Sequence, residues 1–221
     1  NGRDWTQQPV PTRAMLNRVV VNPDGRLFAV GHDGVVLLSK DQGRRWSIQH
    51  QAISDQRPNI LYDVAFVTPQ RGYAIGAFGF MLVTEDAGQS WQAQDNALTQ
   101  SGLHLNAIAR LGDNGLIVVG ERGLVAVSQD QGVTWKLSAP AYAGSFFGVL
   151  PTSANTALVY GQRGRLYDIK DISRLQAGDP ASFDPLIMPS PDDAQALKLG
   201  FRRILSPVEA SLFGATRLAD G

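Results

Sequence analysis

The chain has 221 residues, with 20 basic and 20 acidic side chains, so its formal net charge at pH 7 is zero. This balance excludes a global positive field that would attract nucleic acid or anionic lipid, and leaves only a local basic patch open. The chain has no cysteine, which excludes disulfides, and no run of 18 or more apolar residues, which excludes a membrane-spanning helix.

The first predicted unit contains short apolar strands separated by tight turns. Residues 16–21, 27–30 and 35–38 are apolar stretches, separated by Pro23-Asp24-Gly25 and by a G-x-x-G turn. The third stretch leads into the motif S/T-x-D-x-G-x-x-W at residues 39–46, which we call the Asp box. Apolar runs of this length between glycine-rich turns are typical of antiparallel strands, and we expect a fourth strand after the box.

The same pattern recurs along the chain. Three Asp boxes follow one another at steps of 45 and 44 residues, and they occupy residues 39–46, 84–91 and 128–135. A G-x-x-G turn begins eight residues before each box, at Gly31, Gly76 and Gly120. A fourth turn begins at Gly161, and Asp171 follows it at the place of the box aspartate. The glycine and tryptophan of this fourth box are missing, so the box has decayed.

A further recurrent strand precedes each G-x-x-G turn. Its copies begin at Leu16, Leu61, Leu105, Phe146 and Leu212. The last step is 66 residues instead of 41 to 45, so we place an insertion of about 20 residues within 177–203. Apolar residues flanked by prolines lie at 182–189, and 192–203 predict a short helix that is acidic at its start and basic at its end. Such an insertion decorates a binding face or forms a surface loop.

Four short antiparallel strands in about 45 residues are the signature of a β-propeller blade. We therefore predict an all-β chain, one β-propeller region over 1–221 with four-stranded antiparallel blades. Its repeats span about 6–46, 47–91, 92–135 and 136–175, followed by the insertion at about 177–203 and the start of a fifth repeat at 204–221. Because the first residues align with the end of an Asp box and the last residues stop before a second strand, we expect part of a larger propeller of about seven blades. A closed ring of four or five blades is the alternative.

The Asp-box side chains have structural tasks in this scheme. The carboxylate accepts hydrogen bonds from turn amides, the glycine adopts a backbone conformation that a Cβ disfavours, and the tryptophan buries about 200 Å² between neighbouring sheets. We therefore expect structural rather than catalytic or metal-binding roles for Asp41, Gly43, Trp46, Asp86, Gly88, Trp91, Asp130, Gly132 and Trp135. No histidine has a metal-ligand spacing, so neither a metal nor a cofactor is expected.

Arginines in the G-x-x-G turns are the first candidate binding residues. Arg122 and Arg163 hold the same place in consecutive turns, so they should be neighbours on one face. Three further arginines are expected nearby: Arg165, Arg202 and Arg203. Arginine grips carboxylates through two parallel hydrogen bonds, which makes an acidic segment of a client protein the expected ligand. The alternative is that these are solvated turn residues.

The second candidate region is the inner strand of each blade. Its second residue should line the central channel or its rim; the equivalent residues are Asn17, Tyr62, Asn106, Phe147 and Phe213. Aromatic and amide groups at a propeller mouth can bind a peptide or a sugar, which makes Tyr62 and Asn106 candidates. The alternative is packing between neighbouring inner strands.

The boxes and G-x-x-G turns resemble the BNR/Asp-box superfamily, which includes sialidases, sortilin-like receptors and xyloglucanases. The pattern G-x-x-G-x-[VL]-x-x-[ST]-x-D over about residues 1–175 is most similar to the photosystem II assembly/stability factor family and its non-photosynthetic bacterial members. The resemblance implies a non-enzymatic scaffold of the periplasm or cell envelope. Its partner would be a protein client, such as a membrane protein or a transporter complex of the RND type, and not nucleic acid.

The family also implies a binding surface, because an arginine-rich patch is implicated in its photosynthetic members. Here the first two turns carry Asp33 and Phe78, so Arg122 and Arg163 make up only half of such a stripe.

The alternative function is a glycan-binding or sialidase-like, glycoside-hydrolysing propeller. A sialidase needs an arginine triad, a Tyr/Glu pair and an acidic Asp, and no local motif places them here. We therefore expect no enzymatic activity.

Overall fold

The structure is a computed structural model that describes residues 3–54, 59–179, 192–216 and 218. These residues form four four-stranded sheets. The first contains β1 (Leu16–Val21), β2 (Leu27–Gly31), β3 (Val36–Ser39) and β4 (Ser47–His50). The second contains β5 (Leu61–Phe66), β6 (Gly72–Gly76), β7 (Met81–Thr84) and β8 (Gln92–Ala93). The third contains β9 (Leu105–Leu111), β10 (Gly115–Gly120), β11 (Val125–Ser128) and β12 (Lys136–Leu137). The fourth contains β13 (Phe146–Pro151), β14 (Ala157–Gly161), β15 (Leu166–Ile169) and β16 (Arg202–Ile204).

Short helical segments connect these strands. Each G-x-x-G turn forms a 3-10 turn, namely η1 (His32–Gly34), η2 (Ala77–Gly79), η3 (Glu121–Gly123) and η4 (Gln162–Gly164). The remaining segments are α1 (Ala97–Gln100), η5 (Ile172–Arg174) and α2 (Asp193–Lys198). Within the described ranges, no helix combines the length and the apolarity needed to cross a membrane.

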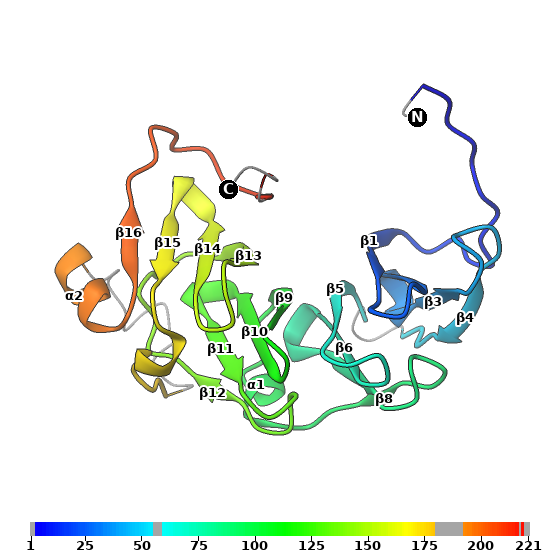
Figure 1. Ribbon diagram of the computed structural model, residues 1–221, viewed down its shortest axis with the longest axis horizontal. Helices are drawn as coiled ribbons and strands as arrows, with labels where there is room; N and C mark the ends of the chain where they lie inside the picture. Colours follow the sequence, from blue (N-terminus) through cyan, green and yellow to red (C-terminus); the bar gives the residue numbers. More distant parts are fainter. Residues whose placement is uncertain (1–2, 55–58, 180–191, 217, 219–221) are drawn as a thin grey trace.

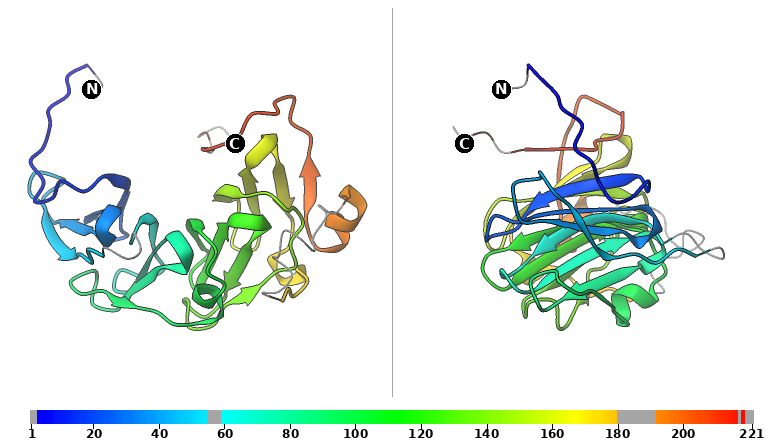
Figure 2. Two further views of the ribbon diagram at one scale, coloured as in Figure 1. Left: turned by 180° about the vertical axis from the view of Figure 1, so that it is seen from behind. Right: turned by 90° about the vertical axis from the view of Figure 1, so that its right-hand side faces the viewer.

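The four sheets are consecutive blades of an open arc. Strands follow chain order within each sheet and all neighbours are antiparallel, so every blade is a meander. Figure 1 shows β1, β5, β9 and β13 on the concave side of the arc, with both ends of the chain near its open side. The same arc is seen from behind and edge-on in Figure 2. The prediction of an all-β propeller region with four-stranded antiparallel blades is confirmed.

The core lies between neighbouring blades, because each sheet buries its faces against the next sheet. One cluster combines Tyr73 and Ile75 of β6 with Leu116 and Val118 of β10. Another combines Phe28 of β2 with residues of the second blade. The middle strands are buried on both faces, which explains why they are continuous apolar runs in the sequence.

The box glycines permit close approach of these blades. Gly132 has a φ of +86°, and a Cβ on it would lie 2.3 Å from Cζ of Tyr73 in the preceding blade. Gly88 meets Phe28 in the same way, with 2.2 Å from its Cβ position to Cε1. Both the left-handed backbone and the neighbouring ring therefore require glycine. Gly43 shares the conformation, but its Cβ position is 3.4 Å from the nearest described atom outside its turn.

The fourth blade differs from the sequence-based boundaries. Arg203 of β16 pairs with Tyr167 of β15, so residues 202–204 are the outer strand of the fourth blade, whereas we had placed 177–203 between two repeats. The decayed box explains the difference, because a longer connection through η5 and α2 replaces the tight turn and hides the period. Its segment 182–189 lies outside the described residues.

The predicted helix of the insertion and the predicted fifth repeat can be located in the structure. The helix predicted within 192–203 is α2, which ends at Lys198 before Gly200 adopts a φ of +101°. In the predicted fifth repeat, Leu212 donates its N–H to the carbonyl of Gly161 at 2.9 Å. From Leu205 onward, no described residue of that repeat forms a strand. The aligned glycine at position 2 and the final Asp220-Gly221 lie outside the described residues.

Candidate functional site

The Asp boxes are closed hydrogen-bonded turns. Asp130 accepts the N–H of Thr134 at 2.9 Å and its hydroxyl at 2.6 Å, while Ser128 donates to the same carboxylate at 2.7 Å. Asp86 has the equivalent bonds from Ser90 and Thr84. Desolvation opposes ionisation of both carboxyls, but these hydrogen bonds outweigh it and lower the pKa of each to about 2.

The box tryptophans also make their contacts within the fold. Trp91 is 7% exposed and packs edge-on against Phe28 and Phe66, and Trp135 packs edge-on against Tyr73. Over the described ranges, no group of three or more His, Asp or Glu side chains could hold a metal ion. The box residues therefore have the contacts expected of structural parts.

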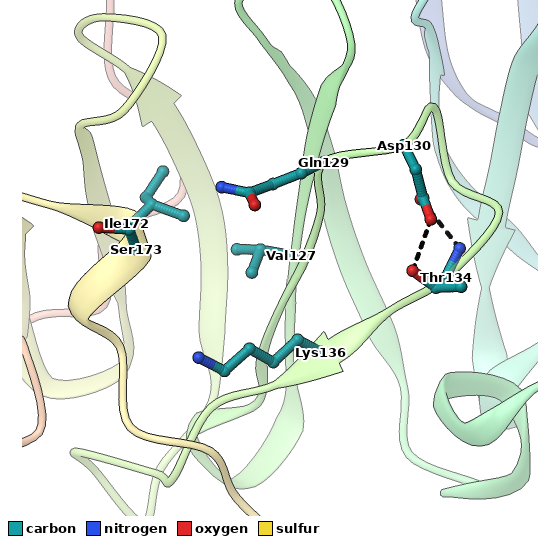
Figure 3. A pocket seen from close by; sticks show the side chains of 7 residues that line it. All are labelled: Val127, Gln129, Asp130, Thr134, Lys136, Ile172 and Ser173. Atoms are coloured by element: carbon teal, nitrogen blue, oxygen red, sulfur yellow. Dashed lines mark hydrogen bonds between the residues drawn. The ribbon is translucent and has the colours of Figure 1, made fainter.

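A crevice of about 380 Å³ lies beside the third Asp box (Figure 3). Asp130 and Thr134 line one side of it, and Ile172 and Ser173 of η5 line the other. A smaller crevice of about 170 Å³ occupies the equivalent place in the second blade. Val83, Glu85, Asp86, Ser90 and Gln92 of that crevice match Val127, Gln129, Asp130, Thr134 and Lys136 by repeat position. Since the repeat itself produces these spaces, their shape does not distinguish a ligand site.

The four G-x-x-G turns share an unusual backbone. Their third residues have left-handed φ angles of 54° to 58°; they are Asp33, Phe78, Arg122 and Arg163. This conformation costs a side-chain-bearing residue about 1–2 kcal/mol. The residue that follows is glycine for a separate reason, because a Cβ on Gly164 would lie 1.8 Å from the carbonyl oxygen of Val208. We call the side of the arc with these turns the G-x-x-G face. Costly conformations held by the surroundings occur often at functional sites.

Three of the predicted arginines come together on this face. Arg163, Arg165 and Arg203 line a pocket of about 440 Å³ together with Gly164, Ser206, Val208 and Glu209. We call it the arginine crevice. The guanidinium of Arg165 lies 5.5 Å from the ring centre of Tyr142, and that of Arg203 lies 3.3 Å from the Asp193 carboxylate. These contacts hold two of the cations in place, and the described lining has three cations and one acidic residue, Glu209, with Asp193 paired to Arg203 beside it.

The other two predicted arginines lie elsewhere. Arg202 is next to Arg203 in β16 but pairs with the buried Asp168 at 2.5 Å, and Lys170 binds the same carboxylate at 2.9 Å. Successive strand residues point to opposite faces of a sheet, which explains why these two neighbours separate. Arg122 is exposed in the turn of the third blade, next to the blade that carries the arginine crevice.

The inner-strand candidates contact the next blade. Four of the five occupy a β-bulge, where an extra residue re-aims a side chain, whereas Phe213 lies outside any strand. Asn17 donates its amide to the carbonyl of Leu61, and Asn106 donates to that of Phe146, both at 2.8 Å. The Tyr62 hydroxyl lies 3.5 Å from Nδ1 of His104, just before the third blade. The Phe147 ring stacks on that of Phe213 in the C-terminal segment, with ring centroids 4.8 Å apart. Asn106 and Tyr62 thus join blades, as in the packing alternative.

Two groups of neighbouring residues were not predicted from the sequence. Asp63 of β5 is buried, and its carboxylate pairs with Arg18 of the first blade at 3.2 Å and accepts the N–H of Ile108 in the third at 3.0 Å. Burial raises the pKa of Asp63, although these partners act in the opposite direction. An acidic residue inside an apolar strand was the available signal. The second grouping is an apolar space around Phe78, and its signal was the match between Phe78 and Arg163 in the repeat.

Comparison with known proteins gives a family and a fold. The family model described as photosynthesis system II assembly factor YCF48 matches residues 1–83 and 50–175. None of the curated proteins matches significantly. The chain resembles the solved structure of YCF48 bound to D1 peptide, with 18% identity, a TM-score of 0.55, and coverage of 72% of this chain and 52% of that one.

Two further solved structures extend this likeness. YCF48 from Cyanidioschyzon merolae is 21% identical, with a TM-score of 0.56 and coverage of 76% and 56% of the two chains. The structure of U3-55K is 13% identical, with a TM-score of 0.61 and coverage of 76% and 50%. At these identities the likeness establishes the fold alone. The chain spans about half the length of these solved structures.

Proposed function

The chain belongs to the photosynthesis system II assembly factor YCF48 family, and we propose on this basis that it is a non-enzymatic scaffold that binds a segment of a client protein. A related solved structure is YCF48 bound to D1 peptide, so peptide binding is compatible with this architecture. The proposed client is a protein of the cell envelope, a membrane protein or a transporter complex, and the proposed location is the periplasm or the envelope.

The arginine crevice is the observation that carries this proposal. Three guanidinium groups line one pocket of about 440 Å³; they come from the turn η4, the residue just before β15 and the strand β16, and Glu209 is the acidic residue of the described lining. Because arginine binds carboxylates through paired hydrogen bonds, the ligand that this lining favours is an acidic stretch of polypeptide. Arg122 on the neighbouring turn extends the positive surface along the same face. Asn106 and Tyr62, which join blades, are not part of the proposed binding surface.

The proposal is tested with a labelled peptide that carries a cluster of Asp and Glu residues, and with the same peptide carrying Asn and Gln instead. Fluorescence anisotropy should detect binding of the acidic peptide only, with an affinity that falls as salt rises. Arg163→Glu should weaken binding at least tenfold, because it places a like charge in the crevice. Arg44→Glu makes the same charge change on the exposed first Asp box and is the matched control.

Four outcomes would count against this function. Equal affinity for the acidic and neutral peptides, or equal loss in the two variants, would remove the arginine crevice as the site. Turnover of a fluorogenic sialoside, or strong binding on a glycan array, would favour the glycan-directed alternative. Copurification of an envelope membrane protein, lost in Arg163→Glu and kept in Arg44→Glu, would support the proposed class of client.

A further inference from the structure

The arginine crevice has a counterpart in the second blade. The repeat places Phe78, Phe80 and Ala93 where the fourth blade has Arg163, Arg165 and Arg203. Strand pairing confirms the match, because Ala93 opposes Leu82 in the second blade and Arg203 opposes Tyr167, the equivalent residue, in the fourth. These residues line a second pocket on the G-x-x-G face, of about 170 Å³. We call it the apolar crevice; its lining is Asn59, Ala77, Phe78, Gly79, Phe80, Met81, Ala93 and Gln94.

The chemistry of the apolar crevice differs completely from that of the arginine crevice. None of the described residues that line it is charged. A charged group placed there would lose water without gaining an ionic partner from the described lining, whereas an apolar side chain has no hydrogen bonds to water to give up. Phe78 presents apolar surface to this space, since the residue lines the crevice and is 39% exposed. The uncharged lining, with Phe78, Phe80 and Met81 in it, therefore favours an apolar occupant over a charged one.

The position of the Phe78 ring is also fixed before an occupant binds. The backbone of Phe78 is left-handed, with a φ of 55°, and it is followed by Gly79, where a Cβ would lie 2.2 Å from the carbonyl oxygen of Thr99. The ring packs edge-on against His104, with centroids 4.6 Å apart. A ring fixed before binding loses little conformational entropy when a ligand covers it. Gln94 has no side-chain hydrogen bond to any described residue, so its amide is available for the backbone of a bound peptide.

We propose that the G-x-x-G face binds one extended client segment that places an apolar, preferably aromatic, side chain in the apolar crevice and acidic side chains in the arginine crevice. This inference rests on the proposed function and specifies the pattern of the client. The two crevices are built from equivalent positions two blades apart, and the exposed Arg122 lies on the intervening blade. The segment therefore follows the arc across the third blade, with its negative charge toward Arg122 and the fourth blade.

Peptide probes of fixed composition test the inference. One series carries a single Phe at increasing distances from an Asp/Glu cluster, separated by a Gly-Ser spacer, and a second series has Ser in place of Phe. At the spacing that bridges the two crevices, Phe should strengthen binding about tenfold, since burial of one large apolar side chain supplies such a factor. Phe78→Asn should abolish this gain and leave the Ser series unchanged, because Asn tolerates the left-handed turn.

The controls separate this inference from the proposed function. Val133→Asn removes an apolar side chain that is 62% exposed in the third Asp box, and it should keep the full gain. If the Ser series binds but no spacing of Phe binds more tightly, the two-part recognition is wrong while the acidic site stands. If the Ser series does not bind the unaltered chain, the proposed function fails as well. A gain that survives in Phe78→Asn, with an unchanged melting temperature, would place the apolar contact elsewhere.

Discussion

Substitution of Gly132 by alanine tests the packing between blades. Two effects add at this residue. The φ of +86° makes any side chain cost about 1–2 kcal/mol. The added Cβ would also lie 2.3 Å from Cζ of Tyr73, which forces a shift in a fully buried ring. Overpacking of this kind typically costs about 1–3 kcal/mol. We therefore expect Gly132→Ala to lower the free energy of unfolding by about 2–5 kcal/mol, the sum of these two ranges.

Gly43 provides the matched comparison. Its φ of +85° is almost the same, but its Cβ position is 3.4 Å from the nearest Leu27 atom, which is ordinary contact. Gly43→Ala should therefore cost only the backbone contribution, about 1–2 kcal/mol. Urea unfolding of the two variants, followed by tryptophan fluorescence and circular dichroism, measures the difference. Equal losses, or a larger loss for Gly43→Ala, would refute the idea that the blades lock through the box glycine.

A double variant sharpens the test. Tyr73→Leu removes the atoms that the new Cβ would meet, together with the hydroxyl that donates to the carbonyl of Gln131 at 2.9 Å. Residues in direct contact do not act independently, so Gly132→Ala should cost less in the Tyr73→Leu background than in the unaltered chain. Strictly additive losses would mean that the ring and the glycine do not meet as described.

Three further predictions concern carboxylates and a blade-joining amide. The pKa of Asp86 is lowered from 3.8 to about 2, so its stabilisation is present above pH 4 and is lost as pH falls through about 2. Asp86→Asn should flatten the stability profile between pH 4 and pH 2 in urea titrations. Asp63 has the opposite sign, because its raised pKa makes its contribution largest in acid and smaller as pH rises through the folded pKa. The difference in unfolding free energy between Asp63→Asn and the unaltered chain should therefore shift in favour of the variant between pH 4 and pH 7. Asn106→Ala removes the hydrogen bond to Phe146 and should cost about 0.5–1.5 kcal/mol of stability without changing the affinity for acidic peptides.

Local features of the sequence were sufficient to predict the strands and turns of the blades. The Asp130 carboxylate binds groups no more than four residues away, so the motif itself contains the turn. Repetition at a fixed period then predicted four-stranded sheets and the shared face of the G-x-x-G turns. The strand that brings Arg203 to this face could not be predicted, because β16 pairs with β15 across a connection without a period.

The candidate site was predicted only in part for the same reason. Arg163 and Arg165 could be grouped from one turn, whereas their separation from Arg202 depends on which side of β16 each arginine occupies. The roles of Asn17 and Asn106 could not be predicted either, since an amide at a bulge can face a ligand or the next strand with equal ease. The apolar crevice was within reach of the sequence, because the repeat aligns Phe78 with Arg163 and Phe80 with Arg165.

The meander order of the strands has a consequence for folding. Every strand pairs with its neighbour in the chain, so each sheet needs closure of short loops only, except between β15 and β16. Short loops close with little loss of entropy, and topologies rich in local contacts fold quickly. As the chain emerges during synthesis, each blade can form and dock on the one before it. The fourth blade is complete only when β16 has paired with β15. We therefore expect this pairing, which brings Arg203 to the arginine crevice, to be the slow step.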